Sequence, residues 1–251
     1  MTLPWNPAQY LKFAGSRTRA ASELLARVPL EAPPAVVDLG CGPGNSTALL
    51  AARWPGARIT GVDSSPEMLA AAREAMPGIA WIQGDVASWT PDAPVDLLFA
   101  NAVLHWLPDH EALLPRLMGC LAPGGVLAVQ MPMNGDSPAH RRLRELAGPA
   151  GDSGGWRPPL APEAYYRILA PHASSVDVWE TEYQQVMTGL DDIVEWAKGA
   201  ALLPHLRGLG AEEAEALLAR VREGLAGLYA PQPDGKVLFP FKRLFFVATR
   251  A

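Results

Sequence analysis

The sequence has 251 residues, 49% of them hydrophobic and 19% charged, so it can bury a sizeable core, and global disorder is excluded. Its formal net charge at pH 7 is −5, which argues against nucleic acid as a partner, because phosphate-binding surfaces depend on clustered cations. The length fits one large domain, residues 1–251.

Short apolar runs alternate with helical patterns through the first half of the chain. This pattern predicts strands at 35–39, 58–63, 80–84, 95–100 and 125–131, with helices at 45–53 and 66–76. Ser65 is expected to cap the second helix, with Pro66 at its first position. Strands separated by helices predict an α/β fold, in which a parallel sheet carries helices on both faces.

The second half of the chain has a different character. A segment rich in Gly, Pro, Asp and Ser at 134–162 surrounds one expected helix at 139–146, and an alternating strand pattern follows at 176–187. A helical pattern at 191–229, interrupted near Pro204 and at 208–210, precedes a terminal strand at 244–248. We therefore predict four parts within one domain: an N-terminal helical lid, a cofactor-binding core, substrate-side loops with a helical insertion, and a terminal strand, at 1–30, 31–133, 134–235 and 236–251.

Cysteine and histidine usage bears on metals and on the cellular compartment. Cys41 and Cys120 are too few for a disulfide framework, and the five histidines show no metal-ligand spacing. We expect a cytoplasmic protein without a metal. No apolar run around Trp5 suggests a signal peptide, and the uncharged stretch 117–135 is broken by Pro123, so no membrane partner is expected.

A glycine-rich turn follows the first predicted strand, with the sequence Asp38-Leu39-Gly40-Cys41-Gly42-Pro43-Gly44. Glycines at this place let a nucleotide-like ligand approach the backbone closely. The dinucleotide spacing GxGxxG places a pyrophosphate on a helix N-terminus, whereas the spacing here is GxGxG. The carboxylate of Asp38 would repel a pyrophosphate but could hold a cationic amine. The turn therefore favours S-adenosylmethionine over NAD, and a nicotinamide-dependent dehydrogenase or a plain strand-to-helix turn are the alternatives.

Polar residues also follow the next three predicted strands. Asp63 ends the second strand, where an acid can accept both ribose hydroxyls, and Asp85 follows the third, where it can read an adenine edge. Asn101 follows the fourth strand. Each residue alone could simply belong to a turn. Together they lie at the carboxyl ends of successive strands and predict a cofactor-binding edge.

Several blocks of sequence carry a family resemblance. DLGCGPGNST, GVDSSPEML, the Gly-Asp pair at 84–85 and FANAVLHWLPDH together resemble the class I S-adenosylmethionine-dependent methyltransferases. More narrowly, WNPAQYLKF, GGVLAVQMP, VDVWETEY, DDIVEW and RLFFVA resemble the trans-aconitate 2-methyltransferase family over nearly the whole chain.

The resemblance implies a Rossmann-like seven-stranded, mostly parallel sheet with an antiparallel last strand, and S-adenosyl-L-methionine as the cofactor. It also implies a set of cofactor-lining residues, some of which contribute only backbone. With the acid before the glycines and two aromatic residues of the lid, the expected cofactor-binding residues are Asp38, Gly40, Cys41, Gly42, Asp63, Ser64, Asp85, Val86, Asn101, Trp5 and Tyr10.

The reaction implied by the resemblance is methylation of a carboxylate oxygen of trans-aconitate or a related small polycarboxylate. A carboxylate with a pKa near ~4 is already ionised at neutral pH, so no general base is required. Cations must instead hold the carboxylates that do not react. Candidate substrate-binding residues, each of which could equally be a solvated cation or a packed aromatic, are Tyr10, Arg17, Arg19, His105, Trp106, Arg157, Tyr165 and Lys198.

The run Gly15-Ser16-Arg17-Thr18-Arg19 lacks the acid of the narrower family's Glu-Arg-x-Arg pattern, and three further positions also depart from that family. Met133 stands where an acid is usual, Leu203 where an arginine is usual, and His205 where a tyrosine is usual. All three fall in the substrate half, so a different small acceptor stays an alternative. The expected partners are a small anionic substrate and at most a second copy of the chain, as a monomer or homodimer.

Overall fold

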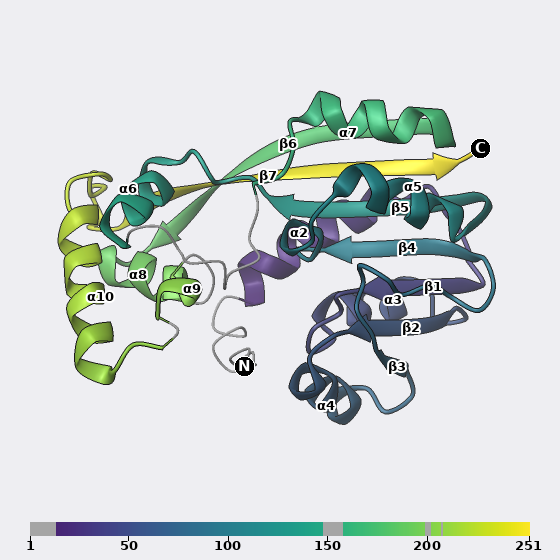
Figure 1. Ribbon diagram of the computed structural model, residues 1–251, viewed down its shortest axis with the longest axis horizontal. Helices are drawn as coiled ribbons and strands as arrows, with labels where there is room; N and C mark the ends of the chain where they lie inside the picture. The colour runs from purple at the N-terminus through teal and green to yellow at the C-terminus, as the bar shows by residue number, and fades with distance from the viewer. Residues whose placement is uncertain (1–13, 148–157, 199–201, 207) are drawn as a thin grey trace. The chain divides into compact units, whose positions relative to one another are not determined.

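The computed structural model describes residues 14–147, 158–198, 202–206 and 208–251 (Figure 1). The described chain forms two compact units. The first, called the sheet unit, contains the described residues up to Pro132, then Pro159–Glu180 and Leu244–Ala251. The second, called the helical unit, contains the described residues between Met133 and Pro158 together with Thr181–Arg243.

Seven strands form one sheet in the order β3-β2-β1-β4-β5-β7-β6. They are β1 (Ala35–Leu39), β2 (Arg58–Asp63), β3 (Ala80–Gln83), β4 (Val95–Asn101), β5 (Leu121–Pro132), β6 (Ala173–Met187) and β7 (Val237–Arg250). The first five pair in parallel. Strand β7 runs antiparallel to β5, because Met133 donates its N–H to Lys242 while the Arg250 guanidinium bonds the carbonyl of Leu121 at the other end of β5. The predicted mostly parallel sheet with an antiparallel last strand is confirmed.

The order of strands in the sheet changes direction at β1: β2 and β3 follow on one side of it, and β4 and β5 on the other. This strand is buried along its whole length and pairs with β2 on one edge and β4 on the other. Helices that follow β1 and β4 therefore leave in different directions. In open α/β sheets such a switch point creates a crevice outside the carboxyl ends of the strands, where ligands bind.

Five α-helices and two short 3-10 turns belong to the sheet unit: α2 (Ala14–Ala26), α3 (Asn45–Arg53), α4 (Pro66–Ala75), α5 (His110–Gly119), α7 (Pro162–Leu169), η1 (Leu104–Trp106) and η2 (Ala170–His172). The predicted cap of α4 is confirmed, since the Ser65 hydroxyl accepts the N–H of Met68 at 3.2 Å and Pro66 opens the helix. Helix α2 packs against α3, and α5 packs against α7 (Figure 1).

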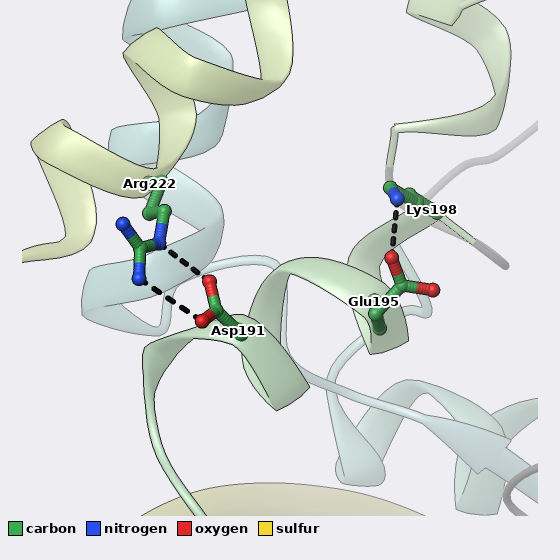
Figure 2. Close-up of polar contacts among 4 residues, drawn as sticks. All are labelled: Asp191, Glu195, Lys198 and Arg222. Carbon is green, nitrogen blue, oxygen red and sulfur yellow. Dashed lines mark hydrogen bonds and ion pairs between the residues drawn. The ribbon is translucent and has the colours of Figure 1, made fainter. Parts of the chain in front are cut away.

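The helical unit contains α6 (Pro138–Ala147), α8 (Leu190–Lys198), α9 (Leu203–Leu206) and α10 (Ala211–Leu225). Helix α10 packs against α6 and α8. Figure 2 shows two ion pairs of this unit: Arg222 of α10 bonds both oxygens of Asp191 on α8, and within α8 Lys198 bonds Glu195 one turn away. The Arg222 and Asp191 side chains are both largely exposed, so this pair contributes at most about 1 kcal/mol.

Several element boundaries differ from the sequence prediction. Strand β5 begins at Leu121 instead of 125, because it passes through the Pro-Gly-Gly segment with a register shift opposite β4. Strand β7 begins at Val237 instead of 244. The helical pattern at 191–229 is divided into α8, α9 and α10, and the interruption expected at 208–210 falls between α9 and α10. Helix α7 was not predicted, because it lies beside a Gly- and Pro-rich segment. No helix among the described residues has the length and apolarity needed to cross a membrane.

Candidate functional site at the carboxyl edge of the sheet

The glycine-rich turn connects β1 to α3 and leans on the end of β2. Gly40 and Cys41 both donate their N–H groups to the carbonyl of Val62, at 2.7 and 3.1 Å. Gly40 has φ +65°, and a Cβ there would lie 2.3 Å from a methyl of Val103. Gly42 has φ +54°, and a Cβ there would meet no atom within 4 Å. The first glycine is therefore required by packing within the protein, whereas the second borders open space at the edge of the sheet.

Asp63 at the end of β2 is held by the same turn. One carboxylate oxygen accepts the N–H of Gly42 at 2.8 Å, and the other accepts the N–H of Ser65 at 2.9 Å. The side chain is partly exposed. Two backbone donors fix the plane of the carboxylate, and each oxygen keeps a lone pair for a further donor. Asp63 is thus oriented as an acceptor of two hydroxyl groups.

Asp38 lies beneath the glycine turn and is fully buried. One of its oxygens accepts hydrogen bonds from Ser46 at 2.8 Å and Thr47 at 2.6 Å, which anchors the first turn of α3 to the end of β1. The other oxygen is buried without a partner among the described residues. Sequence reasoning placed Asp38 against a cationic amine. In the structure one oxygen of Asp38 anchors α3, the other has no partner among the described residues, and the contact with a cationic amine stays a prediction.

Burial sets the protonation of Asp38. Removal from water raises the pKa of its carboxyl to about 7, the hydrogen bonds from Thr47 and Ser46 partly oppose this rise, and the negative charge of Asp63 adds to it. The folded protein therefore favours a protonated Asp38 below neutral pH.

The Asp38→Asn variant is expected to change the pH dependence of stability. Because the folded-state pKa is raised, the protonated carboxyl contributes stability that is complete below 3.8 and is lost as pH rises towards about 7. The free energy of urea unfolding, measured without ligand at pH 5 and pH 8, should shift in favour of the variant by about 2 kcal/mol between these two conditions. An equal difference between the two proteins at both pH values would contradict this role.

Cys41 lies in the glycine turn, and its N–H is bonded to the carbonyl of Val62. Its side chain is buried, and burial, followed by the charges of Asp38 and Asp63, raises the pKa of the thiol. A neutral buried thiol is a poor nucleophile. The side chain instead fills the space next to Gly61, where a Cβ would lie 3.0 Å from its sulfur.

The segment after β3 forms the next part of this edge of the sheet. Gly84 donates its N–H to the carbonyl of Asp63 at 3.0 Å, and the carboxylate of Asp85 accepts the N–H of Ala87 at 2.9 Å. Asp85 is exposed, whereas Val86 is buried. The guanidinium of Arg116 on α5 donates to the carbonyl of Val86 at 2.6 Å and to that of Trp89, also at 2.6 Å. Such charge-assisted bonds fix the shape of the 85–89 loop.

The residues after β4 complete the edge. Asn101 pairs with Gln130 of β5, and its side-chain oxygen is buried without a donor among the described residues. Ala102 adopts φ +56° and turns the chain into η1. In η1 His105 is buried and its ring lies 4.8 Å from that of Trp106. A buried amide oxygen that lacks a donor is costly, so Asn101 marks a place where a ligand donor would be stabilised.

The residues at this edge fit an adenosyl cofactor with an ammonium group. The open space at Gly42, the oriented carboxylate of Asp63 and the orphan oxygen of Asn101 lie at the ends of adjacent strands β2, β1 and β4. They offer acceptors for hydroxyl and ammonium donors and no cluster of cations for a pyrophosphate. In the described part of the chain no group of three His, Cys, Asp or Glu could hold a metal ion.

Further candidate residues were predicted in the N-terminal segment and at Arg157. Trp5, Tyr10 and Arg157 lie outside the described residues. Arg17 belongs to α2 by its backbone. Arg19 is exposed on the same helix and forms an ion pair with Glu23 at 2.9 Å, one turn further on.

The remaining substrate candidates are Tyr165 and Lys198. Tyr165 on α7 is fully buried: its hydroxyl lies 2.8 Å from the His110 ring, accepts the N–H of Leu160 at 3.1 Å, and its ring stacks on Phe246 at 5.2 Å. Burial raises the pKa of Tyr165 to about 12. We therefore assign Tyr165 to the core instead of the acceptor site. Lys198 lies on α8 of the helical unit, in the ion pair with Glu195.

Some contributors to the edge were not predicted from sequence. Val103 limits Gly40 to glycine, and Arg116 fixes the loop after β3. No local pattern indicates them, because both act across the fold. The pair Ser46-Thr47 directly after the glycine turn was the one available signal for the anchoring of Asp38, since hydroxyl residues at a helix start commonly bond nearby acceptors.

Comparison with known proteins agrees with this geometry. Residues 36–125 match the model of a methyltransferase domain. The chain is 56% identical over 250 residues to trans-aconitate 2-methyltransferase of Azoarcus sp. (strain BH72), covering 98% of this chain and 99% of that protein. It is 49% identical over 247 residues to the protein of the same name from Escherichia coli O8 (strain IAI1), with 98% of each chain covered.

Solved structures share the fold at low sequence identity. The YcgJ protein from Bacillus subtilis superposes with a TM-score of 0.61 at 14% identity, covering 92% of this chain and 98% of that one. Phosphoethanolamine N-methyltransferase 2 of Haemonchus contortus, in complex with S-adenosylhomocysteine, gives a TM-score of 0.59 at 18% identity, covering 92% of this chain and 52% of that one. Both similarities concern the Rossmann-like architecture.

Proposed function

Because the chain belongs to the trans-aconitate 2-methyltransferase family, we propose that it transfers a methyl group to a carboxylate oxygen of trans-aconitate or a closely related small polycarboxylate. The observation that carries the proposal is identity of 56% over 98% of the chain, together with a carboxyl edge that suits an adenosyl cofactor. S-adenosylmethionine is the methyl donor, and it supplies a methyl group carried on a positively charged sulfur. This family membership leaves no support for the nicotinamide alternative.

The sheet edge would hold the cofactor through complementary acceptors. Asp63 would accept the ribose hydroxyls, since its carboxylate is already oriented by Gly42 and Ser65. The loop that Arg116 fixes would border the adenine, with Asp85 at its start. The orphan oxygen of Asn101 would accept from an ammonium or amide donor.

The proposed methyl transfer requires little acid–base catalysis from the protein. A carboxylate acceptor is ionised at neutral pH, so the nucleophile needs no proton removed. What the residues must supply is alignment of the two reacting groups and exclusion of water, and proximity of this kind can lower a barrier by roughly 7–11 kcal/mol. Cationic or amide donors must hold the carboxylates that do not react, because an unpaired charge away from water is costly.

The acceptor is tested by a methyl-donor consumption assay. The panel contains trans-aconitate, cis-aconitate, isopropylmalate and less charged acids, and mass spectrometry identifies the product. We expect a methyl ester of trans-aconitate as the main product. A carbon- or nitrogen-methylated product would overturn the proposed nucleophile. Preference for a less charged acid would instead favour the alternative suggested by the unusual residues Met133, Leu203 and His205.

A further inference from the structure

Helix α5 begins with a buried histidine that is bonded through both ring nitrogens. Nε2 of His110 lies 2.8 Å from the carbonyl oxygen of Leu104, and Nδ1 lies 2.8 Å from the hydroxyl of Tyr165. The carbonyl of Leu104 can only accept, so Nε2 carries a proton. Nδ1 then accepts from the hydroxyl of Tyr165, which itself accepts the N–H of Leu160 at 3.1 Å. Both ring nitrogens and the hydroxyl are therefore engaged.

These bonds form one chain between two segments that are far apart in sequence. It starts at the N–H of Leu160, just before α7, and passes through Tyr165 and His110. It ends at the carbonyl of Leu104, the first residue of η1. The ends of the chain are backbone groups, and its middle consists of two buried side chains that belong to the same unit. A change in either side chain would therefore act on the backbone of η1.

The loop that receives this bond is strained at both ends. It connects β4 to α5, and two of its non-glycine residues have left-handed backbones: Ala102 with φ +56° and Asp109 with φ +53°. Such conformations are unfavourable for residues with a side chain and persist only where the surroundings hold them. Inside the loop, the N–H of Leu107 donates to the carbonyl of Leu104 at 2.8 Å and closes η1. The ring of His110 holds the same carbonyl from outside the turn.

The same loop borders the cofactor edge. It follows Asn101, whose side-chain oxygen is buried without a donor among the described residues. Val103 packs so closely on the glycine turn that an added Cβ at Gly40 would lie 2.3 Å from it. His105 and Trp106 come next, in η1 itself. A displacement of η1 would thus move residues beside the place where methyl transfer is proposed.

Packing alone does not require a polar pair at this position. Tyr165 stacks on Phe246 at 5.2 Å, and Leu169, one turn further along α7, is fully buried, so the surroundings are those of an apolar core. A buried polar network is costly unless all its members are paired, and when they are paired it fixes one arrangement of the chain. The bonds of His110 and Tyr165 meet this condition.

We propose that His110 and Tyr165 are positioning residues for methyl transfer, which fix η1 at the cofactor edge through the carbonyl of Leu104. The role is indirect: the two side chains set the place of η1, and through it the alignment of the acceptor with the methyl group. This inference rests on the proposed function, because it takes methyl transfer at this edge as the reaction. It gives Tyr165, expected from the sequence to bind the acceptor, a role without contact to it.

The test uses the full chain with the variants Tyr165→Phe, His110→Leu, His110→Gln and Leu169→Ala. The first two break the chain of hydrogen bonds, whereas the glutamine keeps an N–H₂ group that can donate to the carbonyl of Leu104. Leu169→Ala is the matched control, because it removes buried volume from the same helix without removing any of these bonds.

Four quantities are measured. They are kcat and KM with trans-aconitate, the affinity for S-adenosylhomocysteine by calorimetry, and the Tm of the ligand-free protein. A readout independent of turnover is the ¹⁹F resonance of Trp106 in protein labelled with fluorotryptophan. The chain has eight tryptophans, so the variant Trp106→Phe assigns this signal.

Tyr165→Phe should lower kcat about tenfold and change KM less, because a misplacement of roughly 1 Å can cost on the order of a hundredfold in rate. The affinity for S-adenosylhomocysteine should stay within about twofold, since Asp63 is held by other bonds. The resonance of Trp106 should shift in Tyr165→Phe and keep its place in Leu169→Ala. This control should lower the Tm more than Tyr165→Phe and leave kcat within about twofold.

The histidine variants test whether the two side chains act together. His110→Leu should lower kcat at least as much as Tyr165→Phe, and His110→Gln should recover part of it. In the His110→Leu background, Tyr165→Phe should lower kcat no further, because the chain is already broken. Tyr165→Phe removes one oxygen and keeps the ring, so the proposal can be tested even if His110→Leu does not fold.

The positioning role is overturned if Tyr165→Phe keeps both the kcat and the Trp106 resonance of the parent chain. An equal loss of kcat in Leu169→Ala and Tyr165→Phe would overturn it as well, since lower stability would then explain both. If the parent chain methylates no acid of the panel, the proposed function falls on its own. The Trp106 resonance then decides the link to η1: a shift in Tyr165→Phe supports it, and an unchanged signal overturns it.

Discussion

Asp63→Ala is expected to weaken the binding of S-adenosylhomocysteine about thirtyfold or more while the protein still folds. The variant loses the carboxylate that would accept two ribose hydroxyls, and hydrogen bonds to a charged acceptor contribute about 2 kcal/mol. It also frees the N–H groups of Gly42 and Ser65, which are partly buried and can be taken over by water. Calorimetric titration gives the affinity, and a thermal melt shows that the fold is kept.

Asp85→Ala is the matched comparison. Asp85 is exposed and its carboxylate bonds only within its own loop, to Ala87, so its loss should weaken cofactor binding by a smaller factor than the loss of Asp63. A folded Asp63→Ala protein that binds S-adenosylhomocysteine as tightly as the parent chain would show that the ribose contact is assigned to the wrong residue.

Gly40→Ala should destabilise the protein severely, by about 3 kcal/mol or more. The residue has φ +65°, where a side chain costs about 1 kcal/mol, and the new Cβ would lie 2.3 Å from Val103 in a buried part of the sheet edge. Urea unfolding measures the loss. The double variant Gly40→Ala, Val103→Ala should recover part of it, because the clash is relieved while the backbone strain stays.

Gly42→Ala separates packing from ligand binding. This glycine has a similar backbone, φ +54°, but no atom lies within 4 Å of the added Cβ. Its cost in stability should be limited to about 1 kcal/mol of strain, whereas the methyl group would occupy the space left for the cofactor. We therefore expect Gly40→Ala to act mainly on folding and Gly42→Ala mainly on the affinity for S-adenosylhomocysteine. Equal losses of stability in the two variants would contradict this division.

The sequence was sufficient for the elements that form this edge of the sheet. Strand β1 is a short apolar run with a breaker before it and glycines after it, and Ser65-Pro66 is a local helix start, so both could be located from neighbouring residues alone. Asp63 followed from its place at the end of β2. These features depend on patterns a few residues long, which sequence reasoning handles well.

Other features depend on which way a side chain points. Tyr165 has chemistry that suits a ligand, yet the structure directs its side chain into the core. The bond from the N–H of Met133 to the carbonyl of Lys242 appears only when β7 is placed beside the end of β5. The antiparallel register that joins them involves residues far apart in the chain, and no local pattern encodes it.

The position of β7 has a consequence for how the chain folds. This strand is the last in chain order, yet it lies between β5 and β6 in the sheet. During synthesis one edge of β5 therefore stays unpaired until the residues of the helical unit that precede β7 have been made. An unpaired edge of an apolar strand can pair with other chains. Closing the sheet through such distant contacts is slow. The nascent protein is thus prone to aggregation until β7 pairs with β5 and covers that edge.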